Sequence, residues 1–205
     1  MTTVPLEVTG LSCRRGGRLV FAGLSFALTG GELLALTGRN GSGKTTLLRA
    51  LAQLVTAEAG QIHWQGEDVA RDREAWRRQI AWLGHLDGLK GDLSVRENLS
   101  IAAKLRDEPP DRIDQALASF DLAPLARREV RTLSAGQRRR VALARVASSH
   151  APVWLLDEPL NALDAPSQAA LRAMLARHLA SGGLAIAATH APIDIAGVRV
   201  LELGR

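Results

Sequence analysis

A glycine-rich run that contains a single lysine carries the clearest chemistry in this sequence of 205 residues. Residues 38–45, GRNGSGKT, fit the spacing G-x-x-x-x-G-K-[ST] between an apolar segment of strand length and a segment of helical spacing. Glycines let backbone N–H groups surround phosphate oxygens, and the N-terminal end of the following helix attracts negative charge. The run predicts a nucleotide-binding loop. Its expected contact residues are Gly38, Arg39, Asn40, Gly41, Ser42, Gly43, Lys44, Thr45 and Thr46.

Two side chains of this loop have specific expected roles. Lys44 is expected to neutralise the β- and γ-phosphate oxygens of ATP, and the Thr45 hydroxyl is expected to ligate Mg²⁺. Lysine occurs elsewhere only at positions 90 and 104, whereas arginine is frequent. A lysine at this position therefore indicates that a compact point charge is needed. ATP and Mg²⁺ are the predicted cofactors.

Two adjacent carboxylates end an apolar run in the last third of the chain. Residues 153–156 predict a buried strand, and Asp157 and Glu158 follow at once. Both acids should lie at the carboxyl edge of the sheet, where open α/β sheets bind ligands. Asp157 suits the Mg²⁺ shell through a water, and Glu158 is placed to orient or deprotonate the water that attacks the γ-phosphate. Two acids that merely end a strand are the alternative, and the phosphate loop favours the catalytic interpretation.

Two further features have both a structural and a functional interpretation. His190 follows a predicted strand at 184–188, so it should reach the same edge of the sheet, although a lone histidine is more often structural. The segment LSAGQ at 133–137 opens a predicted helix, with Ser134 as its N-cap. Such a helix start is equally suited to an anion. The residues alone do not separate these interpretations.

Hydrophobic periodicity predicts an α/β protein. Strands are expected at 6–8, 18–21, 24–28, 33–36, 61–65, 80–83, 153–156, 184–188 and 198–203, and helices at 46–53, 94–106, 111–120, 134–148 and 168–179. Asp111 is expected to cap the helix that it opens. Alternating strands and helices imply a largely parallel sheet that is covered on both faces, after a small β-rich entry region and with a helical lobe at about 87–133.

The composition limits the class of protein. With 46% hydrophobic and 23% charged residues, the chain can bury a core and differs from disordered sequences. It has no apolar run of ~18 residues and no signal-peptide pattern, so a soluble cytoplasmic chain is expected. The net charge of +5 would suit nucleic acid or an anionic surface. Aromatic residues make up 3% and tyrosine is absent, so bases would have little to stack on.

Together, the segments GRNGSGKT, LSAGQ, WLLDE, NALD and TH resemble, in order and spacing, the ATP-binding cassette (ABC) ATPases over essentially the whole chain. The resemblance implies one P-loop NTPase cassette over residues 1–205, with a core at 1–86 and 134–205 and a helical subdomain at 87–133. In this family two cassettes pair head to tail. The segment that corresponds to LSAGQ at 133–137, called the signature segment, completes the nucleotide site of the opposite cassette. By this resemblance His190 senses the γ-phosphate. The residues implied to contact ATP in trans are Ser134, Ala135, Gly136, Gln137 and Asp164.

Three positions depart from the pattern of the family. His85 stands where the family usually carries a loop glutamine that touches Mg²⁺ and the membrane partner, and the resemblance leaves open whether His85 contacts the metal. The family's adenine-stacking aromatic residue falls near 14–16, where Arg15 is the expected replacement because a guanidinium can also stack on a base. Ala135 replaces a more common glycine, and this small change should preserve access to the phosphates.

A finer resemblance is to the ATP-binding subunits of the bacterial cytochrome c maturation, or haem-exporter-type, ABC complexes. It is carried by IHWQG at 62–66, WLGH at 82–85, LSAGQRRRVALAR at 133–145 and ATHAP at 188–192. It implies a homodimer that docks on an integral membrane permease at the cytoplasmic face of the inner membrane, without a nucleic-acid partner. ATP hydrolysis would then be coupled to haem export or to release of a haem-loaded periplasmic chaperone.

Three other functions share part of this pattern. The same type of subunit could serve another cargo, such as a lipid, a lipoprotein or a drug. A soluble ABC ATPase acting on nucleic acid would use the basic charge, but only ~90 residues separate Lys44 from Ser134 and no sustained heptads fill them, unlike the long coiled coil of DNA-repair members. A P-loop kinase or GTPase would leave LSAGQ and His190 unexplained.

Overall fold

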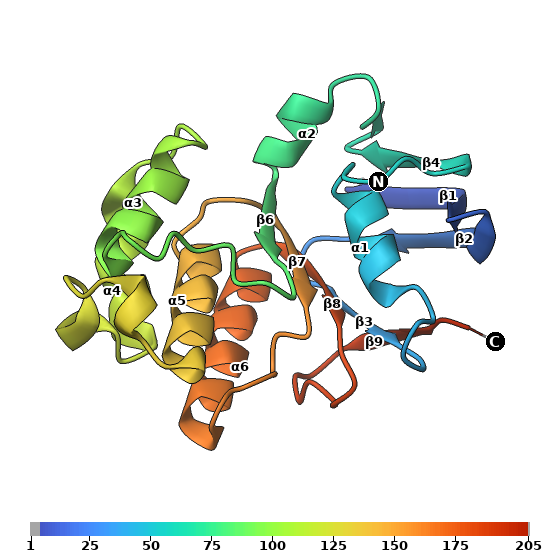
Figure 1. Ribbon diagram of the computed structural model, residues 1–205. Helices are drawn as coiled ribbons and strands as arrows, with labels where there is room; N and C mark the ends of the chain where they lie inside the picture. The colour runs from blue at the N-terminus through green and yellow to red at the C-terminus, as the bar shows by residue number, and fades with distance from the viewer. Residues whose placement is uncertain (1–4, 205) are drawn as a thin grey trace.

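Two β-sheets organise the chain, and the computed structural model describes residues 5–204 of it (Figure 1). The first sheet is antiparallel with the order β2-β1-β4-β5, and the second is parallel with the order β6-β7-β8-β3-β9. The strands of the first sheet are β1 Leu6–Arg15, β2 Arg18–Leu28, β4 Ala59–Trp64 and β5 Glu67–Asp68. Those of the second are β3 Leu33–Thr37, β6 Ile80–Leu83, β7 Val153–Asp157, β8 Leu184–Ala188 and β9 Arg199–Glu202.

Helices cover this framework. They are α1 Lys44–Leu51, α2 Arg73–Arg78, α3 Val95–Lys104, α4 Ile113–Ser119, α5 Ala135–Ala147 and α6 Ala165–Ala180, with 3₁₀ turns at Pro110–Arg112, Ala123–Leu125 and Val130–Thr132. Within residues 5–204, none of these helices is long and apolar enough to span a bilayer. Residues 1–4 and residue 205, at the two ends of the predicted cassette, lie outside the described residues.

The parallel sheet separates two hydrophobic cores. Every residue of β7 is buried, and its side chains alternate between the two faces. Val153 and Leu155 pack with α1 and the antiparallel sheet, while Trp154 and Leu156 pack with α3, α4, α5 and α6. Figure 1 shows the same division, with α1 and β1 on one side and the larger group of helices on the other. The predicted α/β fold, with a covered parallel sheet, an antiparallel β region and a helical lobe, is confirmed.

One long strand replaces two predicted ones. Residues 18–21 and 24–28 were expected as separate strands, but β2 continues through Gly23, which has a φ of 64°. The pairing of β2 with β1 shifts register near this point, and the Gly23 N–H donates to Ser12 Oγ at 2.9 Å. A bulge therefore interrupts the alternation of apolar residues without ending the strand.

One expectation for the helices was wrong, and one helix was not expected. Asp111 does not cap a helix, because its carboxylate lies 2.9 Å from His150 Nε2 and interacts with that ring. Helix α4 begins after Arg112 without a side-chain cap. Helix α2 was not expected, because its six residues bury only Trp76 and so give no helical period. Its start is set by Asp72, whose side chain accepts from the N–H groups of Glu74 and Ala75.

A histidine packed on a tryptophan joins α6 to the parallel sheet. The His178 ring stacks on Trp154 with centroids 3.8 Å apart and planes 8° apart. Its Nε2 lies 3.1 Å from the carbonyl oxygen of Leu184, so this nitrogen donates. A Cβ added to Gly183 would lie 2.2 Å from the ring, so only glycine fits at that position. Burial lowers the pKa of His178 to about 4.

The stack predicts an acid-sensitive contribution to stability. The folded-state pKa of His178 lies below the ordinary value of 6.5, so the unfolded chain binds the proton first as the pH falls. The free energy of unfolding should therefore drop by up to about 3 kcal/mol between pH 6.5 and pH 4 from this group. Urea unfolding of the wild type and His178→Phe, compared at pH 8 and at pH 5, measures this contribution. The variant should lose less stability on acidification, and equal losses in both proteins would contradict the assignment.

Candidate active site

Parallel pairing of three strands brings three chemically active segments to one edge of the sheet. Leu36 of β3 lies opposite Ala188 of β8, and Asp157 of β7 lies opposite the same alanine. Two backbone bonds continue this line, since Thr189 N–H donates to Leu36 O at 3.1 Å and Glu158 N–H donates to Ala188 O at 2.9 Å. The loop after β3, the two acids and the histidine after β8 therefore meet.

The loop between β3 and α1 requires glycine at two crowded positions. Gly38 has a φ of 132°, and a Cβ there would lie 2.4 Å from the carbonyl oxygen of Leu203. Gly43 has a φ of 103°, and a Cβ there would lie 2.6 Å from Val20 Cγ1.

The start of α1 is prepared for an anion. The helix has no side-chain cap at Gly43 and no acidic residue in its first turn. Its first N–H groups and its positive dipole end are therefore not engaged by a side chain of the helix start. The buried Ser42 Oγ also has no hydrogen-bond partner within the described residues. These features suit a phosphate group.

Lys44 holds its ammonium group at the mouth of this loop. Its Nζ donates to the carbonyl oxygens of Gly38 at 2.8 Å and of Arg39 at 3.3 Å, and it lies 3.3 Å from His190 Nε2. The residue is only 7% exposed. Carbonyl oxygens do not neutralise the ammonium charge as a carboxylate would, so Lys44 keeps its attraction for an anionic ligand.

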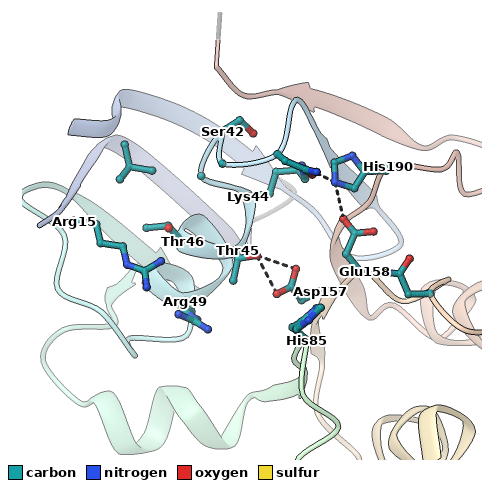
Figure 2. A pocket seen from close by; sticks show the side chains of 15 residues that line it. Arg15, Ser42, Lys44, Thr45, Thr46, Arg49, His85, Asp157, Glu158 and His190 are labelled. Atoms are coloured by element: carbon teal, nitrogen blue, oxygen red, sulfur yellow. Dashed lines mark hydrogen bonds and ion pairs between the residues drawn. The ribbon is translucent and has the colours of Figure 1, made fainter. Parts of the chain in front are cut away.

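Thr45 and Asp157 form a compact set of oxygen donors. The Thr45 hydroxyl donates to Asp157, with Oγ1 3.1 Å from Oδ1 and 3.0 Å from Oδ2, and Asp157 is buried (Figure 2). Hydroxyl and carboxylate oxygens are ligands that Mg²⁺ accepts, usually together with waters and substrate phosphates. The described residues contain no group of three or more His, Cys, Asp or Glu that could hold a metal ion. The two donors fit a Mg²⁺ ion that would take its remaining ligands from waters and a phosphate.

Glu158 points its carboxylate at His190. Glu158 Oε1 lies 3.3 Å from His190 Nε2, and the two side chains are 15% and 49% exposed. When this nitrogen carries a proton it donates to Glu158, and when it does not it accepts from Lys44. Glu158 has a φ of 49°, a strained conformation that costs about 1–3 kcal/mol and is concentrated at functional sites.

These groups line one open pocket of about 640 Å³. Its lining residues are Arg15, Val20, Asn40, Gly41, Ser42, Gly43, Lys44, Thr45, Thr46, Arg49, His85, Asp157, Glu158, Asn161 and His190. Figure 2 shows cationic Arg15 and Arg49 at one end and the acids with His190 at the other. Gly38 and Arg39 are not in the lining; they support Lys44 through their carbonyl oxygens.

Three residues of the lining were not expected from the sequence: Val20, Arg49 and Asn161. Arg49 had a local signal, because it lies four positions after Thr45 and so shares its face of α1. Val20 and Asn161 reach the pocket only through tertiary packing. His85 also lines the pocket, as expected, in the loop that follows β6.

The signature segment lies outside the pocket. Ser134 is the N-cap of α5, as expected, and forms a capping box in which its Oγ accepts from Gln137 N–H at 3.2 Å and its N–H donates to Gln137 Oε1 at 2.9 Å. Ala135 follows on the exposed surface. Gly136 lies against a second loop, since a Cβ there would come within 3.3 Å of Ala162 O.

Asp164 is also exposed and outside the pocket. It caps α6 by accepting from Ser167 N–H at 3.0 Å, and hydrogen bonding to Ser167 lowers the pKa of the carboxyl. The start of α5 and the loop before α6 thus form one surface on the described part of the molecule.

Comparison with known proteins assigns the family. Residues 21–161 match the family model described as ABC transporter. This chain belongs to that family. The ABC ATPase is 49% identical to "Cytochrome c biogenesis ATP-binding export protein CcmA" of Rhodospirillum rubrum over 94% of this chain and 83% of the relative. The protein of the same name from Dechloromonas aromatica is 46% identical over 97% of this chain and 100% of the relative.

Solved structures agree with this assignment. An ATP-binding subunit of an ABC transporter is 26% identical, with a TM-score of 0.83 over 90% of this chain and 79% of that one. A dimeric ATP-binding cassette in a post-hydrolysis state, bound to ADP and phosphate, has a TM-score of 0.85 over 97% of this chain and 94% of that chain. At 22% identity, that second likeness supports the fold alone.

The position of Arg15 predicts a role in affinity for the nucleotide. If its guanidinium stacks on the base, Arg15→Ala should raise the KM for ATP by roughly fivefold, because such a contact contributes about 1 kcal/mol. The value of kcat should change little, since Arg15 lies at the opposite end of the pocket from Glu158. Steady-state hydrolysis measures both constants. Arg73→Ala, at the exposed start of α2 and outside this pocket, is the control, and an unchanged KM in Arg15→Ala would reject the stacking.

Proposed function

We propose that this ABC ATPase is the ATP-binding and hydrolysing subunit of a bacterial cytochrome c biogenesis exporter. The observation that carries the proposal is the 49% identity, over 94% of the chain, to a relative named for ATP binding and export in cytochrome c biogenesis. Further relatives with the same name are 43–46% identical over at least 96% of the chain. The proposed output is haem export or release of a haem-loaded periplasmic chaperone.

In this proposal the chain's own residues bind and orient the nucleotide. The loop N–H groups and Lys44 hold the β- and γ-phosphates, and Arg15 lies against the base. Thr45 and Asp157 would hold Mg²⁺, which neutralises phosphate charge when bound. His85 lines the same pocket, and we include it as a further candidate ligand of the metal.

Glu158 is the proposed base for hydrolysis. Its carboxylate accepts a proton from the attacking water or orients that water toward the γ-phosphorus. His190 lies between Glu158 and Lys44, so it can donate to a γ-phosphate oxygen and respond to its loss. The geometry supports these roles, since a side chain from each of three segments converges on one space.

A second copy is proposed to complete each site. The exposed start of α5 would face the γ-phosphate held by the opposite cassette, with Asp164 at the seam. The proposed division of the chain has a core at 1–86 and 134–205 and a helical subdomain at 87–133, and the two halves of each sandwich are the phosphate loop of one copy and the start of α5 of the other. An integral membrane permease is the further partner, which would place the protein at the cytoplasmic face of the inner membrane.

Replacing the proposed base tests the mechanism. Glu158→Gln should reduce hydrolysis at least about a hundredfold, as expected for loss of a general base, while ATP binding persists. The variant should also accumulate as an ATP-bound dimer, which size-exclusion chromatography with multi-angle light scattering detects. Glu74→Gln, on the exposed surface of α2, is the control and should match the wild type. Wild-type turnover in Glu158→Gln would remove Glu158 from the role.

Deleting the gene tests the cargo. The deletion strain should lose c-type cytochromes and keep b-type cytochromes, because haem synthesis itself is not affected. Haem-stained gels and difference spectra measure both pools. The wild-type gene should restore the c-type pool, and a Lys44→Ala gene should not, since Lys44 is proposed to hold the phosphates. Intact c-type cytochromes in the deletion strain would point to another cargo, such as a lipid, a lipoprotein or a drug.

A further inference from the structure

The strained turn at Glu158 needs support from outside its own strand. Its N–H is satisfied by Ala188 O, but the carbonyl groups of Asp157 and Glu158 face away from the ladder of β7 and β8 toward α5. A non-glycine residue with a φ of 49° persists only where its surroundings hold it. The donor to both carbonyl oxygens is a single side chain, Arg139.

Arg139 is among the most buried charged residues in the described chain, at 5% exposure. Its Nη2 donates to Asp157 O at 2.8 Å and to Glu158 O at 2.6 Å. Its Nη1 donates to Gly84 O at 3.0 Å and to Asp87 Oδ1 at 3.3 Å. The two nitrogens of one guanidinium thus connect α5, the turn at Asp157 and Glu158, and the loop that carries His85.

The partners of Arg139 show why an arginine occupies this position. Three of its four acceptors are backbone carbonyl oxygens, and only Asp87 offers a carboxylate. A planar guanidinium presents several N–H groups in a fixed plane, whereas a lysine ammonium cannot reach both segments with the same geometry. The buried Nε has no hydrogen-bond partner within residues 5–204, so burial of this arginine has a cost that its own hydrogen bonds do not fully offset.

We propose that Arg139 is a positioning residue that holds the Glu158 turn in its left-handed conformation and so aims the carboxylate into the nucleotide pocket. Because the same guanidinium fixes Gly84 and Asp87, it also sets the distance between this turn and His85. The inference rests on the proposed function, in which Glu158 acts on the attacking water. Arg139 itself does not line the pocket, so its effect must pass through the turn.

The expected signature is a loss of kcat without a matching loss of ATP affinity. In the full-length chain, Arg139→Met should lower kcat at least about tenfold, because an unaimed general base loses much of its effect. Arg139→Lys should lose less, since one carbonyl bond can persist. The KM and the equilibrium dissociation constant for ATP should stay within about threefold, because the phosphate loop is untouched.

A second variant separates positioning from folding. Arg139→Ala should recover part of its kcat when free guanidinium is added at a concentration too low to unfold the wild type, because the small cation can occupy the vacated site. Glu158→Gln should show no such recovery. Thermal unfolding of each variant, followed by circular dichroism, checks that the fold is retained.

Arg145 provides the matched control. It lies on the same helix and donates to Gly88 O at 2.9 Å and to Asp87 O at 3.1 Å, so it holds the same loop. Within the described residues it makes no hydrogen bond to β7. Arg145→Lys should keep kcat within about twofold, because the Glu158 turn keeps its donors.

The outcomes are distinguishable. Wild-type kcat in Arg139→Met, or equal losses in Arg139→Lys and Arg145→Lys, would overturn the positioning role while leaving the proposed function intact. If Glu158→Gln keeps its turnover, the proposed base is wrong, and the positioning role falls with it. Loss of hydrolysis in Glu158→Gln, together with a selective and guanidinium-rescued loss in the Arg139 variants, supports both.

Discussion

The parallel register of β3, β8 and β7 is the constraint on which the site depends. Leu36, Ala188 and Asp157 lie on one line across the sheet, so the phosphate loop, the acid pair and His190 all begin within two residues of that line. Thr45 and Asp157 are 112 positions apart in the sequence, yet they share a hydrogen bond. A shift of one residue would exchange the side chains that β7 presents to the two cores, and the close packing of Trp154 in one core and Val153 in the other opposes it.

That register also arranges charge across the pocket. Arg15 comes from the end of β1, Lys44 and Arg49 come from α1, and the two acids come from the end of β7 (Figure 2). Lys44 directs its ammonium group to His190, which lies beside Glu158, while Asp157 accepts from Thr45. Lys44 and Asp157 are both buried, and each is compensated by polar groups instead of a direct ion pair with the other. In the proposed mechanism, a phosphate would therefore find the Lys44 ammonium group already held in the pocket, and the attacking water would find the Glu158 carboxylate beside it.

Features with local spacing could be predicted from the sequence, and features that depend on packing could not. The phosphate loop, the acid pair after 153–156 and the capping serine at 134 all follow from neighbouring residues. The bulge at Gly23 was invisible because it interrupts an alternating pattern that the strand then resumes. Asp111 has the right residue type for a cap, but its partner is His150, on a distant segment. Arg139 is the middle of three consecutive arginines at 138–140, and only its burial and its hydrogen bonds in the folded chain distinguish it.

The start of α5 shows that a structural and a functional interpretation need not compete. Ser134 Oγ accepts the Gln137 N–H, a cap that stabilises the helix by about 1 kcal/mol. A hydroxyl also carries one hydrogen to donate and a second lone pair, so the cap leaves the Ser134 O–H available to an anion. A Cβ at Gly136 would lie 3.3 Å from Ala162 O, so a larger residue would crowd this end of the helix. The sequence could not choose between cap and anion site because the geometry of the cap is compatible with both. Arg139, one turn further along α5, donates to Glu158 O and so links this helix to the turn at Glu158.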